Sequence, residues 1–157
     1  MDIKHFLKSM APVQLLGFST SSSGATLPLT MKRCEKDLGI SEEISSFVLP
    51  LGATINMDGT ALYQGVAAVF IAQAVGMDLT LANQFTIVAT AVLASIGTAA
   101  VPGAGIIMLI IILEAINVPS EGIALILGVD RILDMIRTAT NVTGDATVAS
   151  VMDSLER

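Results

Sequence analysis

The stretch DRILDMIRTATNVTGD, residues 130–145, places charged and polar side chains at helical spacing inside an apolar segment. At about 100° per residue, six of them fall on one helix face about 100° wide. These six are Asp130, Asp134, Arg137, Thr138, Asn141 and Asp145. Carboxylates and a guanidinium are costly next to lipid, so such groups usually face a protein interior and mark a substrate or ion path. The stretch therefore predicts a helix over residues 121–150 and indicates part of a membrane transporter.

Composition agrees with a membrane protein. The chain has 157 residues, of which 53% are hydrophobic and only 14% are charged, too few for a fully solvated surface. It has five Phe, one Tyr and no Trp, so small and aliphatic residues fill the apolar runs, as in tightly packed membrane helices. Its eight Lys and Arg form no basic patch, which argues against a nucleic-acid partner. Cys34 is the only cysteine, so no disulfide framework or paired-thiol metal site is expected.

Four segments follow one another along the chain. Residues 2–36 form a predicted helical hairpin with a serine-rich tip, and residues 41–77 form a helix interrupted near Asn56–Thr60. Residues 81–118 form a second hairpin, whose tip holds glycines and a proline, and the helix over 121–150 comes last. None of the segments offers twenty uninterrupted apolar residues, as a simple spanning helix would. Interrupted helices leave backbone groups free to bind ions and substrate inside a transporter.

The chain also has an internal echo. Asn56-Met57-Asp58-Gly59-Thr60 and Asn141-Val142-Thr143-Gly144-Asp145 share the pattern N-x-x-G with a carboxylate nearby, and each follows a hairpin. Interrupted segments at matching positions of two halves point to a transport site. The echo predicts that the second helix is interrupted as the first one is.

Four motifs together resemble one family, the dicarboxylate/amino acid:cation symporters, also called the glutamate transporter family. The motifs are SSSGATLP (21–28), NMDGT (56–60), SIGTAAVPGAG (95–105) and DRILDMIRTATNVTGD (130–145), in the family's order and spacing. The resemblance implies an all-α membrane protein with two re-entrant helical hairpins and two broken transmembrane helices in an inverted repeat. The segments then match hairpin 1 (2–36), helix 7 (41–77), hairpin 2 (81–118) and helix 8 (121–150).

These pieces form most of the family's moving transport domain. In the family, six further helices precede them and supply the scaffold on which the protein trimerises. We therefore expect residues 1–157 to be a partial transport domain, the C-terminal part of a longer transporter. The resemblance implies a homotrimer for the full-length protein and none for this fragment alone. It also implies a multi-pass protein of the plasma or inner membrane, surrounded by lipid.

Arg137 matches the family's anchor for the side-chain carboxylate of the substrate. A planar guanidinium stays charged and binds a carboxylate through two parallel hydrogen bonds. Taken alone, Arg137 has a second explanation, an ion pair within its own helix. Asp134 stands three residues before it and Asp130 one turn further back, so either carboxylate is a candidate partner.

Asp134 matches the family's acceptor for the substrate α-amino group, which needs an anionic partner in a dry site. Relatives selective for dicarboxylates generally lack an aspartate there, because their substrates have no amino group. Asp134 and Arg137 together favour an acidic amino acid. The neighbouring substrate contacts that the resemblance implies are Met57, Thr60, Thr138 and Asn141.

The hairpin tips supply backbone to the implied substrate site. Ser23, with the main chain of Ser21 and Ser22, matches the part of hairpin 1 that holds the substrate α-carboxylate. Val101 and Gly105 match hairpin 2, the family's gate, where glycine lets the main chain approach a ligand and hinge. Taken alone, ordinary turn chemistry explains both tips.

The resemblance also implies sites for sodium, a hard cation that prefers oxygen ligands. The residues of these sites are Asp145 with carbonyls of Gly52, Asn56 and Asn141; the carbonyls of Thr54, Ser95, Ile96 and Thr98; and Asp58 with the Asn56 side chain. Taken alone, Asp58 and Asp145 have a second explanation as caps that end helices. Caps do not easily explain carboxylates so deep in apolar sequence.

Three positions depart from the family pattern. Many relatives carry an arginine at the position of Ser21 or of Met135, and this chain has none at either. Arg131 stands one turn away as a candidate replacement, or it faces an acidic partner or the solvent. Ala100 takes the place of a usual glycine in hairpin 2, which predicts a stiffer gate. His5 is isolated, and we assign it no proton-relay role.

The leading hypothesis is a sodium-coupled symporter of glutamate or aspartate with elevator-type alternating access. Proton coupling, and a neutral amino acid or dicarboxylate as substrate, remain open within the class. A non-transporting membrane binding module is the alternative from another class. An enzyme using Asp134 and Arg137 is disfavoured, because the serines have no candidate base. No cofactor is expected, and sodium ions are co-transported ligands.

Overall fold

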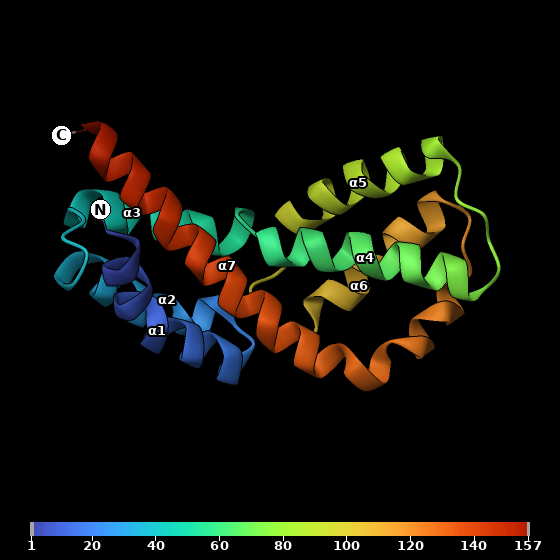
Figure 1. Ribbon diagram of the computed structural model, residues 1–157, viewed down its shortest axis with the longest axis horizontal. Coiled ribbons are helices and arrows are strands. Elements are labelled where there is room, and N and C mark those ends of the chain that lie inside the picture. The colour runs from blue at the N-terminus through green and yellow to red at the C-terminus, as the bar shows by residue number, and fades with distance from the viewer. Residues whose placement is uncertain (1, 157) are drawn as a thin grey trace.

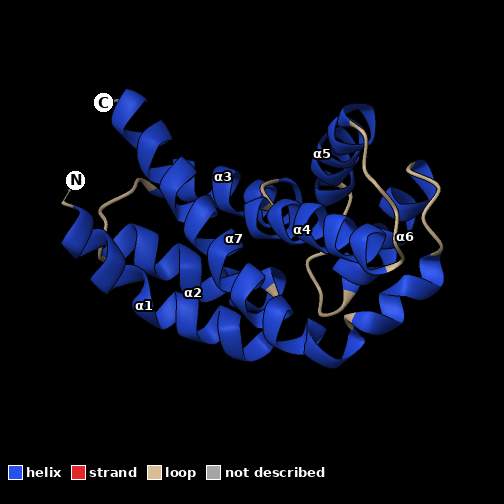
Figure 2. Cartoon of the chain, turned by 45° about the vertical axis from the view of Figure 1, so that its right-hand side comes forward, coloured by secondary structure: helices blue, strands red, loops and turns tan. Residues whose placement is uncertain are grey.

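The computed structural model describes residues 2–156, so residues 1 and 157, the ends of the predicted partial transport domain, lie outside it. All regular secondary structure within 2–156 is helical, which confirms the all-α prediction (Figure 2). The helices are α1 (Ile3–Thr20), α2 (Ser23–Lys36), α3 (Glu42–Ile55), α4 (Asp58–Ala74), α5 (Leu81–Ile96), α6 (Ala104–Ala115), the 3-10 helix η1 (Ser120–Leu125) and α7 (Leu127–Glu156). Between residues 2 and 156, none of these helices combines the length and apolar character needed to cross a bilayer by itself.

Hairpin 1, formed by α1 and α2, reverses direction over two serines. Ser21 adopts a left-handed conformation with φ 51° and donates its N–H to the Gly17 carbonyl, 2.9 Å away, which ends α1. The Ser22 hydroxyl then accepts the N–H of Ala25 at 3.1 Å, which gives α2 its N-cap. The serine cluster therefore ends one helix and begins the next.

The predicted interruption near Asn56 is present between α3 and α4. The side chain of Met57, the N-cap residue of α4, makes no capping hydrogen bond. Instead, the N–H of Gly59 donates to Asn141 Oδ1 on α7, at 2.8 Å. A side chain from another helix thus satisfies a backbone group that the interruption leaves free.

Hairpin 2, formed by α5 and α6, has a longer tip. Thr80 caps α5 by accepting the N–H of Asn83 at 3.2 Å. At the other end, Gly103 has φ 78° and stands directly before α6. Because this left-handed backbone strains residues with a Cβ, glycine suits the tip at this point.

The predicted interruption of the last helix near Asn141 is wrong. α7 runs without a break from Leu127 to Glu156, and the 3-10 helix η1 precedes it. The Asn141 side chain bonds Gly59 and Thr60 of α4, so it does not compete for the backbone of its own helix. Gly144 lets α7 approach the start of α4 closely, since a Cβ added to Gly144 would lie 2.5 Å from Asp58 Oδ2. Both residues serve contacts with α4.

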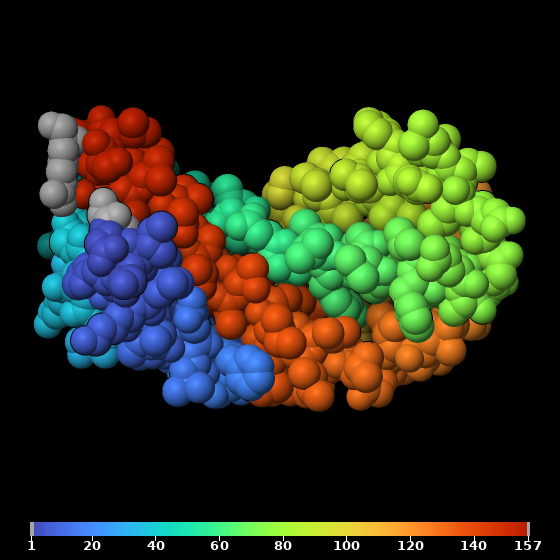
Figure 3. Space-filling model, in the orientation of Figure 1, coloured from blue at the N-terminus to red at the C-terminus, as the bar shows by residue number. Residues whose placement is uncertain are grey.

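Two hydrophobic cores lie along an elongated molecule, and α7 passes from one to the other (Figure 1). One core, between α4, α5, α6 and η1, contains Ile71, Ile87, Leu109, Ile112 and Leu113. The other, between α1, α2, α3 and the second half of α7, contains Met10, Val13, Leu49, Val142 and Ala146. The start of α1 and the end of α7 lie on the same side of the molecule, beside the second core (Figure 1). Figure 3 shows a surface hollowed between the C-terminal end of α7 and α5.

Candidate functional site

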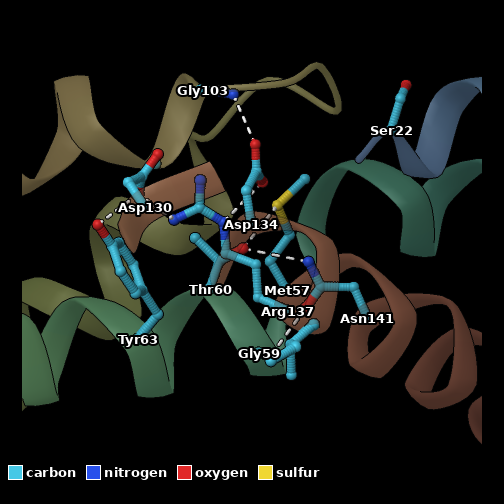
Figure 4. Close-up of polar contacts among 12 residues, drawn as sticks. Ser22, Met57, Gly59, Thr60, Tyr63, Gly103, Asp130, Asp134, Arg137 and Asn141 are labelled. Carbon is cyan, nitrogen blue, oxygen red and sulfur yellow. Dashed lines mark hydrogen bonds and ion pairs between the residues drawn. The ribbon is translucent and has the colours of Figure 1, made fainter. Parts of the chain in front are cut away.

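A cavity of about 20 Å³ lies where the tips of both hairpins meet α4 and α7. Of the residues predicted to bind substrate, all except Ser22 line it; those that do are Ser21, Ser23, Met57, Thr60, Val101, Gly105, Asp134, Arg137, Thr138 and Asn141. Thr98, Ala99 and Ala100 complete the lining. A cavity of this size holds about one water molecule. Figure 4 shows the polar side chains around it.

Arg137 is buried, with 5% of its surface exposed, and faces two carboxylates. Its Nε donates to Asp134 Oδ1 at 2.9 Å, and its Nη1 lies 3.7 Å from Asp130 Oδ1. The intrahelical ion pair considered as an alternative role is therefore present. Within residues 2–156, however, Nη1 has no hydrogen-bond acceptor. A buried charged N–H without a hydrogen-bond acceptor is costly, so a ligand that offers Nη1 an acceptor oxygen would be favoured at this corner of the cavity.

Tyr63 of α4 is a site residue that the sequence interpretation missed. Its hydroxyl donates to Asp130 Oδ1 at 2.6 Å, and its ring lies under the Arg137 guanidinium, 4.4 Å from the ring centroid (Figure 4). Such stacking is a cation–π contact. The signal available in the sequence was that the chain's only tyrosine stands three residues, about one helical turn, after Thr60.

Asp134 connects α7 with the tip of hairpin 2. Its Oδ1 accepts from Arg137, and its Oδ2 accepts the N–H of Gly103 at 2.9 Å. Asp134 is 4% exposed, and both oxygens of its carboxylate have donors. A ligand ammonium that reaches Asp134 must therefore share the carboxylate with the backbone of hairpin 2 or displace it.

Asn141 and Thr60 join α7 to the start of α4. Asn141 Nδ2 donates to Thr60 Oγ1 at 3.1 Å, while Asn141 Oδ1 accepts from Gly59. The Thr60 hydroxyl lies 3.7 Å from the sulfur of Met57, which also lines the cavity. These three predicted residues therefore form one wall of the cavity.

The hairpin tips close the cavity from two sides. The Ser21 hydroxyl is buried and has no hydrogen-bond partner in the described part of the chain, so it is available to a ligand. Ser22 lies behind the lining and donates its hydroxyl to the Ala100 carbonyl at 2.7 Å. Gly105 lies against Arg137, since an added Cβ would be 2.6 Å from Nη1. A residue larger than glycine there would displace the guanidinium.

One predicted cation group is assembled between α3, α4 and α7. Asn56 Nδ2 donates to Asp145 Oδ1 at 3.0 Å, and a Cβ added to Gly52 would lie 2.7 Å from the same oxygen. Asp58, which is exposed, approaches Gly144 one residue before Asp145. Asp145 lies inside α7, so its interpretation as a helix-ending cap is wrong. Asp58 is the first residue of α4, where the helix dipole favours a carboxylate.

The second predicted cation group is less clearly assembled. Thr54, Ser95 and Thr98 each donate their hydroxyls to carbonyls of the preceding turn, at 2.8 Å. The main-chain carbonyls of this group, including Ile96, belong to the last turns of α3 and α5 or directly follow them. Carbonyls at helix ends lack the usual intrahelical donors, which favours cation binding. The Ser95 carbonyl, however, already accepts the N–H of Thr98 at 3.1 Å. α3 and α5 are in contact.

Arg131 does not replace the arginine found elsewhere in many relatives. It is exposed on α7 and does not line the cavity, and Met135 does not line it either. The structure gives no account of Arg131. Ala100, in contrast, lines the cavity and contacts hairpin 1 through its carbonyl.

Comparison with known proteins identifies transporters that are similar to this chain. A proton/sodium-glutamate symport protein of Bacillus subtilis (strain 168) is 49% identical over 156 residues, covering 99% of this chain and 36% of the relative. Excitatory amino acid transporter 1 of Rattus norvegicus is 46% identical over 152 residues, covering 97% and 28%. Excitatory amino acid transporter 3 of Mus musculus is 48% identical over 152 residues, covering 97% and 29%.

The chain thus spans about a third of the length of these curated relatives. The family model described as the sodium:dicarboxylate symporter family matches residues 1–155. The family and these relatives are transporters, so the chain is not an enzyme. With nearly all of its length matched, the chain belongs to the sodium:dicarboxylate symporter family.

Proposed function

We propose that this chain forms the binding core of a sodium-coupled symporter of the acidic amino acids glutamate and aspartate. The observation that carries the proposal is the buried Arg137, whose Nη1 has no acceptor within residues 2–156 although two carboxylates lie nearby. Arg137 would bind the side-chain carboxylate of the substrate, and Asp134 would bind its ammonium group. The unpartnered Ser21 hydroxyl and the N-terminus of α2 would bind the α-carboxylate.

The size of the cavity supports a movement of hairpin 2. A volume of about 20 Å³ is far too small for an amino acid, so hairpin 2 would open to admit the substrate and close over it. In the elevator mechanism of the family, the loaded domain then moves across the membrane. The hairpins would be re-entrant, with their tips meeting inside the protein at the cavity.

A lipid environment accounts for the apolar surface. Large side chains are exposed on successive turns of α5, among them Leu81 at 83% and Phe85 at 75%. Water-soluble monomers rarely expose extended apolar patches, which mark interaction or membrane-facing surfaces. We assign the chain to a multi-pass protein of the plasma or inner membrane. The full-length protein would be a homotrimer, and this chain alone would not trimerise.

Sodium coupling is supported by the oxygen-rich group around Asp145. Asp145, Asn56 and Asp58 lie beside backbone at the end of α3, and hard cations prefer such ligands. One relative is named a proton/sodium-glutamate symport protein, so proton coupling is the alternative that the experiment must separate.

Binding of aspartate and glutamate by calorimetry tests the proposal. The chain is purified in detergent, alone and fused behind the N-terminal part of the Bacillus subtilis relative, and titrated in sodium chloride or choline chloride. We expect sodium-dependent binding by the fusion and its loss in Arg137→Ala. Arg33→Ala is the matched control, because Arg33 pairs with Asp37 in hairpin 1, far from the cavity along the chain.

Each other outcome redirects the assignment. Binding that ignores sodium but follows pH moves the coupling ion to the proton. Binding of succinate or of a neutral amino acid in preference to aspartate overturns the substrate class. If the fusion binds none of these ligands, the proposed function is wrong.

A further inference from the structure

We propose that Gln64 of α4 positions the Arg137 guanidinium for the side-chain carboxylate of the substrate. Gln64 does not line the cavity, and it acts on Arg137 through the backbone of Gly105 in α6. It is therefore a positioning residue that does not itself touch the substrate. The inference deepens the proposed function and rests on it, because that function assigns Arg137 to the substrate carboxylate.

The Gln64 side chain is an amide inside an apolar part of the molecule. It is fully buried, on the face of α4 that also buries Ala67, Ala68 and Ile71 in the core between α4, α5, α6 and η1. Its Oε1 has no hydrogen-bond donor among residues 2–156. A buried amide oxygen without a donor costs free energy, and a methionine of similar size would avoid this cost. Packing of the core therefore does not explain a glutamine at this position.

The nitrogen of the same amide is bonded to hairpin 2. Gln64 Nε2 donates to the Gly105 carbonyl at 3.4 Å, in the first turn of α6. A helical carbonyl is already directed at the N–H four residues later, here that of Leu109, so Gln64 supplies a donor to the second lone pair of the oxygen. This long hydrogen bond joins α4 to α6 and restrains the peptide plane that follows Gly105.

Gly105 in turn lies over the Arg137 guanidinium. A Cβ added to Gly105 would be 2.6 Å from Nη1, 2.7 Å from Cζ and 2.9 Å from Nη2. Because these three distances are nearly equal, Gly105 contacts the face of the planar group and not its edge. The N–H groups of a guanidinium point outward in its plane, so a contact with the face limits tilting and leaves Nη1 directed at a ligand.

Two consecutive residues of α4 thus act on one guanidinium. Tyr63 stacks its ring on Arg137, with the ring centroid 4.4 Å from Cζ, and Gln64 holds the Gly105 backbone that lies on the same group. A side chain that is already held in place loses less conformational freedom when a ligand binds, which raises affinity. The Gln64 amide therefore strengthens binding of a carboxylate, although its unpartnered oxygen weakens the core.

The Arg137 side chain gives the first test, without any ligand. The sequence contains four arginines, so ¹⁵N-arginine labelling gives four Nε–H signals by NMR, and Arg137→Lys identifies the one from Arg137. In detergent micelles, we expect Gln64→Met to speed the rotation of Arg137 about its Nε–Cζ bond about five-fold, as for one lost hydrogen bond. Gln73→Met, the same change at an exposed position of α4, should leave the rate unchanged. An unchanged rate in Gln64→Met would overturn the inference.

Thermal unfolding separates positioning from simple support of the fold. Gln64→Met removes the buried oxygen that has no donor, so its unfolding midpoint in detergent should equal that of the parent chain or exceed it. If the Gln64 amide served only the fold, the midpoint would fall and every ligand would bind more weakly. A lower midpoint in Gln64→Met than in Gln73→Met would therefore contradict a positioning role.

Binding to the fusion protein separates this inference from the proposed function. In sodium chloride, Gln64→Met should bind aspartate about five-fold more weakly by calorimetry. The ratio of aspartate to glutamate affinity should also change, because the two side chains differ by one methylene and bring their carboxylates to Arg137 differently. If the variant binds both ligands as the parent does, the positioning role is wrong and the function stands. If the fusion binds no acidic amino acid, the function fails, and faster Arg137 rotation in Gln64→Met still establishes the contact through Gly105.

Discussion

Tyr63 contacts both the Arg137 guanidinium and the Asp130 carboxylate beside it, so it influences which donors of Arg137 remain available to a ligand. The ring stacks on the cation, and the hydroxyl occupies Asp130, which would otherwise be free to turn towards Arg137. A carboxylate that pairs more closely with Arg137 competes with a ligand carboxylate for the same donors. In the proposed site, selectivity for an acidic side chain would therefore depend on the Tyr63 hydroxyl, which is neutral and lies outside the cavity lining.

Tyr63→Phe is expected to weaken aspartate binding by about three- to ten-fold, as the loss of one buried hydrogen bond predicts. The ring remains in place, so folding should be preserved. Calorimetry on the fusion protein measures the effect, with Tyr63→Leu as a variant that also loses the stacking and should bind still more weakly. Unchanged affinity in Tyr63→Phe would show that Asp130 does not compete for Arg137.

Asp145→Asn is expected to raise the sodium concentration needed for half-maximal aspartate binding by about ten-fold. The substitution removes a negative charge from the proposed cation site, and a hydrogen bond or contact to a charged group is worth about 1.5–3 kcal/mol. Asp153→Asn is the matched control on α7, because Asp153 accepts the N–H of Ser41 near the start of α3. An unaltered sodium dependence in Asp145→Asn would exclude Asp145 as a ligand.

At the scale of residues, the sequence predicted the polar residues that line the cavity, but it did not predict Tyr63, which contacts them. Helical spacing alone placed Asp134, Arg137 and Asn141 on one face, and all of them line the cavity. Spacing within α7 could not reveal Tyr63, because Tyr63 lies on α4 and contacts Asp130 of α7, a helix that is distant in sequence. Such pairings depend on how helices pack, which a single helix pattern does not encode.

At the scale of helices, α4 and α7 approach each other so closely that glycine is required. A Cβ added to Gly59 would lie 2.5 Å from the Arg137 carbonyl oxygen and 2.9 Å from its Cα. These are backbone atoms, which cannot move aside as a flexible side chain can. The same approach brings the Asn141 side chain to the start of α4.

Gly59→Ala is therefore expected to destabilise the protein by about 1–3 kcal/mol through overpacking. Gly65→Ala in the same helix is the control, since no atom lies within 4 Å of an added Cβ there. Alanine is the better helix former, so the control should be neutral or slightly stabilising. Thermal unfolding in detergent compares the two variants, and equal midpoints would contradict the close approach.

The two N-x-x-G sequences predicted one helix interruption correctly and one wrongly. The first coincides with the interruption between α3 and α4, whereas the second lies inside the continuous α7. Asparagine and glycine favour turns, yet they also permit close contact between helices. Whether the helix is interrupted depends on what the asparagine side chain bonds. The Asn141 side chain bonds Gly59 and Thr60 of α4, and α7 continues past it.

At the scale of the whole molecule, the polar site lies between two separate hydrophobic cores. α7 contributes buried Val142 and Ala146 to one core and packs against α4 and η1, which belong to the other. Hairpin 1 packs with the second core and hairpin 2 with the first. Opening of hairpin 2 therefore need not disturb the core that holds hairpin 1.

The exposed apolar surface predicts that the chain requires amphiphiles to stay dispersed. On removal of detergent, we expect the purified chain to aggregate, and with lipid vesicles to float with them in a density gradient, because its exposed apolar side chains avoid water. Gel filtration and flotation check both outcomes. A monodisperse chain in buffer without detergent would contradict the assignment to a membrane.

The place of the only tyrosine has one more consequence. The chain contains no tryptophan, so its phenol emission comes from Tyr63 alone. This phenol contacts both the Arg137 cation and the Asp130 carboxylate, and a hydrogen-bonded carboxylate quenches the excited ring. A ligand that moves Arg137 away from the Tyr63 ring is therefore expected to change the tyrosine fluorescence of the protein. The candidate site thus carries its own optical reporter, which needs neither a dye nor an engineered residue.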